Sequence, residues 1–206
     1  VVVSISDIII LPVPTTRDNK TVFTPADICL PKISADNRAA WTKWAVIACD
    51  QFTSDTAYWQ RVADTVGEEK STLHMILPEA HLGSADEAEC VKKINATMDA
   101  YLTGDVFKTY ANSYVYVERT LINGSIRPGL IGAVDLECYD YRKGSDSLIR
   151  ATEGTVLERI PPRVAVRRDA ILEMPHVMLL IDDPGATVLE PLFEESIPHE
   201  TAYVTD

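Results

Sequence analysis

The sequence predicts an α+β fold, with a mixed, largely antiparallel sheet and helices packed on it. Two strand–helix alternations precede an Asn-Gly dipeptide that joins two strand-like runs. The chain has 206 residues, of which 46% are hydrophobic and 24% are charged. This composition is typical of globular proteins and excludes disordered and collagen-like classes. A chain of this length can bury a core without metals or disulfides.

Residues 1–40 are expected to form an extended N-terminal arm, because prolines at 12, 14, 25 and 31 flank a polar stretch. Residues 41–206 are expected to form a single α+β domain. The first residue is Val, and no helix cap or polar tail precedes the last residue, Asp206. We therefore expect the chain to be a piece of a longer protein.

Short apolar runs predict buried strands at 44–49 and at 72–77, the second one ended by Pro78. Between them, Ser54 and Asp55 open a helix whose apolar positions recur at helical spacing until Gly67. A second helix is predicted from Ser84 to Gly104. Ser84 and Glu87 have the spacing of a capping box, and Gly104 is expected to be a left-handed stop.

A β-hairpin is predicted from runs 113–121 and 129–136, because Asn123 and Gly124 between them tolerate positive φ. Within the first run, Glu118 and Arg119 must face opposite sides of the sheet. Whichever of them faces the core must be paired, either as a site residue or in a structural salt bridge. A last strand is predicted at 176–181.

The charge balance excludes several classes of partner. Thirty-one acids against 19 bases give a net charge of −12, which disfavours nucleic acids and anionic membranes. Every apolar run is shorter than the ~20 residues of a membrane span. The four cysteines lack metal-knuckle spacing and so predict no metal site, and we expect free thiols and a cytoplasmic protein.

Five stretches stand out as motifs: WAVIACDQFTS at 44–54, STLHMILPE at 71–79, YVERT at 116–120, RPGLIGAVDLE at 127–137 and SLIRATEGTVLERIPPR at 147–163. Together they resemble the family named domain of unknown function 1015. The resemblance spans about residues 28–200. It implies members about twice this length. It also implies a similarity to partition-protein-like domains, in which nucleotide-dependent phosphotransfer occurs.

Residues 142–168 carry a net positive charge, opposite to that of the whole chain, with seven bases against three acids. Six of the bases are arginines, whose planar fork grips phosphate or carboxylate. Pro161 and Pro162 stiffen the segment in one of two ways. A polyproline-like hinge would let Arg159 and Arg163 converge on one ligand, whereas a helix starting there would put Arg163 and Arg167 on one face.

The positive charge of this segment suggests the candidate site residues. The predicted ligand-binding residues are Arg150, Arg159, Arg163 and Arg119. Glu153, flanked in sequence by arginines, and Asp50, between the first strand and the first helix, are the predicted catalytic carboxylates. Asp50 is either a base or a metal ligand. No cofactor motif is present, so the cofactor is unknown.

Two functions remain open at this point. The first is binding of a small phosphorylated or nucleotide-like anion, with phosphotransfer as the reaction. The alternative is a non-catalytic interaction module that docks an acidic partner or the rest of its own chain. An exposed apolar surface beside the arginines would favour the alternative, and a cleft in which the arginines converge would favour the first function.

Overall fold

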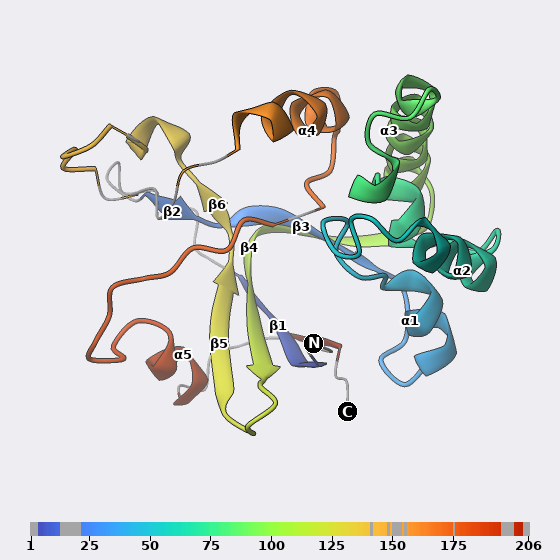
Figure 1. Ribbon diagram of the computed structural model, residues 1–206. Helices are drawn as coiled ribbons and strands as arrows, with labels where there is room; N and C mark the ends of the chain where they lie inside the picture. The colour runs from blue at the N-terminus through green and yellow to red at the C-terminus, as the bar shows by residue number, and fades with distance from the viewer. Residues whose placement is uncertain are drawn as a thin grey trace. The chain divides into compact units, whose positions relative to one another are not determined.

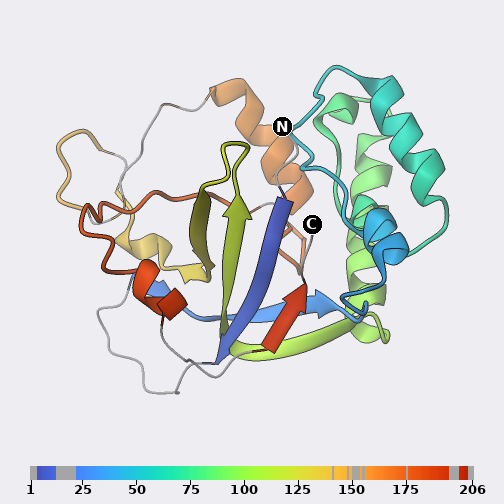
Figure 2. The same ribbon diagram turned by 90° about the horizontal axis from the view of Figure 1, so that it is seen from below.

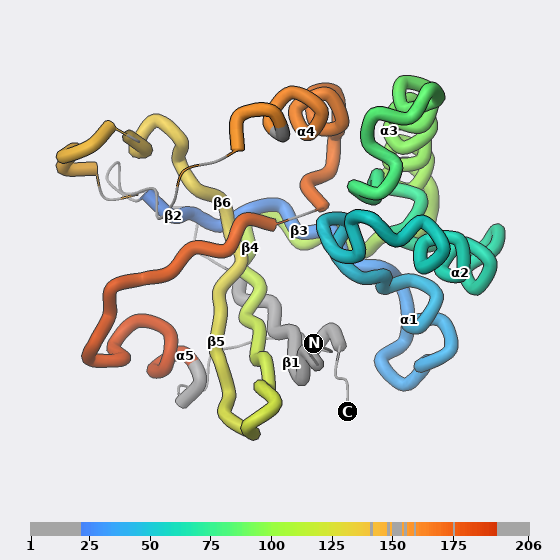
Figure 3. The backbone as a smooth tube through the Cα atoms, viewed as in Figure 1, coloured from blue at the N-terminus to red at the C-terminus, as the bar shows by residue number. Residues whose placement is uncertain are grey.

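The computed structural model describes residues 4–12, 22–140, 142–147, 149, 154, 156–174, 176–194 and 200–203. It divides into two compact units. The sheet unit comprises residues 1–35, 108–154 and 180–206, and the helical unit comprises residues 36–107 and 155–179. The chain thus passes from the sheet unit into the helical unit twice, as the backbone trace in Figure 3 shows.

The sheet unit is built around β4 (Phe107–Thr120), a strand of 14 residues. β4 pairs antiparallel with β1 (Ser4–Pro12) and with β5 (Ile126–Ile131). β3 (Ala26–Pro31) also borders β4, and β7 (Glu200–Tyr203) pairs antiparallel with β1. Figure 2 shows these strands side by side. The predicted largely antiparallel sheet is confirmed.

The predicted hairpin is also confirmed. It joins β4 to β5 through Asn123 and Gly124, and Gly124 has a φ of 81°. The Leu121 N–H donates to the Ser125 carbonyl at 2.8 Å, and the Asn123 side chain accepts from the Ser125 hydroxyl at 2.8 Å. A residue that tolerates positive φ was therefore the correct signal for this turn.

Glu118 is the residue of the Glu118–Arg119 pair that faces the core, with 5% of its surface exposed. The buried Tyr116 lies on the same face of β4, two residues away, and forms a side-chain hydrogen bond with Glu118. Burial raises the pKa of the Tyr116 hydroxyl to about 12, and the carboxylates of Glu118 and Glu190 act in the same direction. The buried carboxylate thus has a polar partner within the sheet unit.

Shorter elements complete the sheet unit, seen in Figure 1. β2 (Phe23–Thr24) pairs antiparallel with β6 (Ala133–Val134) as a separate small sheet. A 3-10 turn, η3 (Leu136–Cys138), follows β6, and a short helix, α5 (Glu190–Glu194), lies near the end of the chain. The rings of Phe23 and Tyr114 stack at 5.4 Å, which ties the small sheet to β4.

The helical unit contains α1 (Arg38–Trp44), α2 (Thr56–Val66), α3 (Glu87–Thr103) and α4 (Ile160–Arg167). Three 3-10 turns join them: η1 (Thr72–Met75), η2 (Glu79–His81) and η4 (Leu157–Arg159). The core of the unit consists of buried apolar side chains from these elements and their connections. They are Trp41, Trp44, Trp59, Val66, Met75, Leu77, Ile94, Met98 and Val106.

Both predicted helices form, but their ends differ in detail from the expectation. The Asp55 carboxylate caps α2 by accepting from the Tyr58 N–H at 2.8 Å. In α3 the Glu87 carboxylate accepts from the Gly83 N–H, not from Ser84. Gly104 has a φ of −83° and is not left-handed. A Cβ there would lie 2.7 Å from the Ala100 carbonyl oxygen, so close approach explains the glycine.

Three predicted strands are wrong. Trp44 ends α1, and residues 45–48 form no strand. Residues 72–75 form the 3-10 turn η1. The Ser71 and Thr72 hydroxyls both donate to the Trp44 carbonyl, and these side-chain hydrogen bonds replace the backbone hydrogen bonds that a strand would make with a neighbouring strand. Residues 176–181 pair with no strand of the described chain, and their apolar side chains are exposed.

The fold class is α+β, as predicted. The sequence signals with a local cause, namely helix caps and the Asn-Gly turn, located their elements correctly. The expected division into an arm (residues 1–40) and a domain (residues 41–206) stays a prediction.

We predict that Gly132→Ala destabilises the sheet unit by about 1–3 kcal/mol, the usual cost of overpacking. A Cβ at residue 132 would lie 2.7 Å from the Thr24 carbonyl oxygen and 2.8 Å from ring atoms of both Phe23 and Tyr114. Urea unfolding measures the loss. Gly129→Ala is the matched control, because a Cβ there meets only the Val117 carbonyl oxygen, at 3.9 Å. Equal effects of the two substitutions would contradict the prediction.

Candidate functional site

The arginine-rich segment, residues 142–168, ends in the helix α4. This is the second of the two conformations considered from the sequence. Pro161 and Pro162 occupy the first turn of α4, where the missing N–H groups have no partner to lose. Arg163 and Arg167 are therefore four residues apart on one face. The diproline starts the helix and does not act as an extended hinge.

Two ion pairs attach this face to the helical unit. The Arg163 guanidinium pairs with the Glu79 carboxylate of η2. The Arg167 guanidinium lies 3.3 Å from the Glu173 carboxylate. The Glu79 side chain is 14% exposed, whereas those of Arg163, Arg167 and Glu173 are between 43% and 60% exposed. The better-buried Arg163–Glu79 pair is therefore the stronger restraint on α4.

A row of apolar side chains lies beside the arginines on the outside of the helix. Leu157 is 72% exposed, Ile160 39% and Val164 45%. At ~100° per residue, Ile160 and Val164 lie between the Arg163–Arg167 row and Arg168. Pro162 and Val166, on the other side of α4, are half-buried. The outer surface of α4 is therefore an apolar stripe with arginines along both edges.

Glu79 also connects α4 to the turn that carries Asp50. Its backbone N–H donates to the Cys49 carbonyl at 2.8 Å, and the Asp50 carboxylate accepts from the Gln51 side chain at 3.3 Å. Burial raises the pKa of the Cys49 thiol; Asp50 and Glu79 raise it further, and Arg167 opposes them. These effects disfavour the thiolate, the nucleophilic form of Cys49.

The predicted site residues are distributed over both units and over residues outside the described part of the chain. Asp50 and Arg163 belong to the same unit and both border Glu79 or its backbone partner, Cys49. Arg119 lies on β4 in the sheet unit. Arg150 and Glu153 lie outside the described residues, and of Arg159 only the backbone, at the end of η4, is described. Their roles stay predictions.

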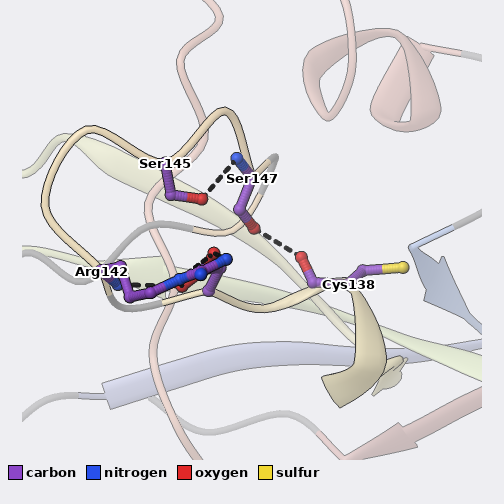
Figure 4. A network of polar contacts seen from close by, with 5 residues as sticks. Cys138, Arg142, Ser145 and Ser147 are labelled. Carbon is purple, nitrogen blue, oxygen red and sulfur yellow. Dashed lines mark hydrogen bonds and ion pairs between the residues drawn. The ribbon is translucent and has the colours of Figure 1, made fainter.

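A second network occupies the start of the arginine-rich segment, in the sheet unit. The Arg142 side chain donates to both oxygens of Asp140, and its backbone N–H donates to Asp140 Oδ1 at 2.9 Å. Beside it, the Ser147 hydroxyl donates to the Cys138 carbonyl at 2.5 Å (Figure 4). The hydrogen bonds from Arg142 lower the pKa of the Asp140 carboxyl to about 2. Arg142 is thus engaged within the loop.

Sequence analysis did not identify the acids that pair with these arginines. Glu79 is 84 residues away from Arg163 in the chain, and no local pattern indicates such a contact. Asp140 stands two residues before Arg142, and this spacing was the one available signal. In the described part of the chain, no group of three or more His, Cys, Asp or Glu side chains could hold a metal ion.

Comparison with known proteins identifies the family. The model of the family described as "Protein of unknown function (DUF1015)" matches residues 32–206. The chain belongs to this family. No curated protein and no solved structure matches it. The helical unit and the α4 surface therefore lie within the part of the chain that defines a DUF1015 protein.

None of the helices among the described residues is long and apolar enough to cross a bilayer.

We predict that Asp140→Asn lowers the free energy of unfolding above about pH 4, and that this loss becomes smaller as the pH falls from about 4 to 2. The pKa of Asp140 is about 2 in the folded protein, below the ordinary value of 3.8 for an aspartate. Its stabilisation is therefore present above pH 4 and is lost as the pH falls. Urea unfolding at a series of pH values measures this. The difference between wild type and variant should shrink below pH 4, and Arg142→Gln should behave like Asp140→Asn. Parallel pH profiles of wild type and Asp140→Asn would contradict the prediction.

Proposed function

We propose that this DUF1015 chain is an interaction module that docks an acidic protein partner on α4. The docking surface consists of the exposed apolar stripe Leu157, Ile160 and Val164, bordered by Arg163, Arg167 and Arg168. The observation that supports the proposal is the exposure of these three apolar side chains next to the arginines. Surfaces with an apolar centre and a charged rim are typical of protein interfaces.

The charges favour an acidic occupant. Arg163, Arg167 and Arg168 follow one another without an intervening acid, in a chain whose net charge is −12. A basic rim on an acidic protein attracts carboxylates selectively and sets the orientation of the partner. The best match is an amphipathic helix with an apolar face and flanking Asp or Glu, because it can lie along the stripe.

Anion binding with phosphotransfer at Arg150, Arg159 and Arg163, served by Glu153 and Asp50, stays a prediction. The four free thiols support the expected cytoplasmic location, where cysteines remain reduced.

We predict that a labelled amphipathic peptide of Leu and Glu binds the protein, with an affinity that falls as salt is added. Val164→Glu should weaken the binding by at least about tenfold, since it places a carboxylate in the apolar stripe. The variant should fold normally because Val164 is half exposed. Fluorescence anisotropy measures the binding. Val188→Glu is the matched control, because Val188 is an exposed valine of the sheet unit.

Four results would contradict the proposal. The first is no binding of the Leu/Glu peptide at millimolar concentration. The second is equal binding of a Leu/Lys peptide of the same length, which would remove the role of the arginines. The third is an equal loss in the Val188→Glu control. A self-association that Val164→Glu abolishes, without peptide binding, would show a second copy as the occupant and would also contradict an acidic partner.

A further inference from the structure

Two arginines lie directly opposite each other in the β4–β5 hairpin. The strand register pairs Arg119 of β4 with Arg127 of β5. Facing residues of an antiparallel pair project from the same side of the sheet, with Cβ atoms ~4.5–5.5 Å apart, and like charges in this position repel each other. Arg119 is half-buried and Arg127 is exposed. The register therefore places two positively charged residues directly opposite each other, an arrangement that destabilises a strand pair.

Within the part of the chain that the structure describes, no acid is paired with either arginine on this face. The register places Ile5 of β1 on the other side of Arg119, and the next row on this face pairs Val117 with Gly129. Glu118, the nearest acid along β4, is buried on the opposite face. Among the described residues neither guanidinium forms an ion pair, although the chain has 31 acids. Arg142, Arg163 and Arg167, by contrast, each have a carboxylate partner.

The neighbouring row leaves room beside the two arginines. Gly129 follows Arg127 on the same face of β5, and a Cβ placed there would meet only the Val117 carbonyl oxygen, at 3.9 Å. The face therefore has open space one row away from the guanidinium groups.

We propose that Arg119 and Arg127 form a binding site for a phosphate dianion, either free phosphate or the monoester of a small molecule. A phosphate carries about −1.5 to −2 charges at neutral pH and so neutralises both arginines. Its oxygens can accept paired hydrogen bonds from two guanidinium forks at once. The ligand removes the repulsion between the arginines, so ligand binding should stabilise the hairpin.

This proposal rests on observations other than those behind the docking surface on α4, namely the β4–β5 register and not the exposure of α4. It gives the predicted ligand residue Arg119 a partner, Arg127, that sequence analysis did not identify. The facing position of the two residues appears only when the strand register is known.

Thermal unfolding in phosphate, compared with sodium chloride of equal ionic strength, tests the proposal. Wild type should be stabilised by inorganic phosphate or by phenyl phosphate, and the two additions distinguish free phosphate from a monoester. Arg127→Gln should melt at a higher temperature than wild type in phosphate-free buffer, since the repulsion is gone. It should also bind phosphate at least about tenfold more weakly in calorimetry.

Lys92→Gln is the matched control, because Lys92 is an exposed cation on α3 in the other unit. It should keep the full response to phosphate. The proposal is overturned by a wild type that responds to neither phosphate, or by an Arg127→Gln variant that responds as wild type does. Equal stabilisation by succinate would overturn the assignment to phosphate. None of these outcomes depends on peptide binding at α4.

Discussion

The ion pair between Arg163 and Glu79 determines which side of α4 faces outward. It connects the helix to η2, and through the Glu79 backbone to the turn at Cys49. With Arg163 held there, Pro162 and Val166 turn toward the helical unit, and Ile160 and Val164 turn away from it. The apolar stripe on which the proposed docking depends is therefore the side of α4 that this ion pair and the packing of Pro162 and Val166 leave facing outward.

The free energies of ion pairing and of apolar burial indicate different roles for the arginines and the apolar stripe. A partly exposed ion pair contributes about 0.2–1 kcal/mol, which is enough to orient a short helix and too little to hold a partner. Burial of a Val, Leu or Ile side chain gains about 1.5–3 kcal/mol when it is complete. The apolar stripe can therefore supply most of the binding free energy, while the arginines set the orientation and specificity of the complex.

Sequence signals succeeded where one short segment decides the structure. The Asp55 cap, the apolar spacing of α3 and the Asn123–Gly124 turn all act within a few residues. They failed where a distant group decides it. The segment at 72–77 has the composition of a strand, but Ser71 and Thr72 satisfy the carbonyl of Trp44, more than 25 residues earlier in the chain. The pairing of Arg163 with Glu79, and the facing of Arg119 and Arg127, depend in the same way on tertiary structure.

A double-mutant cycle on Arg163 and Glu79, with amide exchange of α4 as the readout, tests the central claim most directly. Arg163→Gln and Glu79→Gln should each speed the exchange of the α4 amides about two- to fivefold, and the double variant should be no faster than either one. Lys43→Gln breaks the Lys43–Glu69 ion pair on α1 and should leave α4 unchanged. Unaltered exchange of α4 in Arg163→Gln would contradict the account, because the ion pair would then not hold the helix.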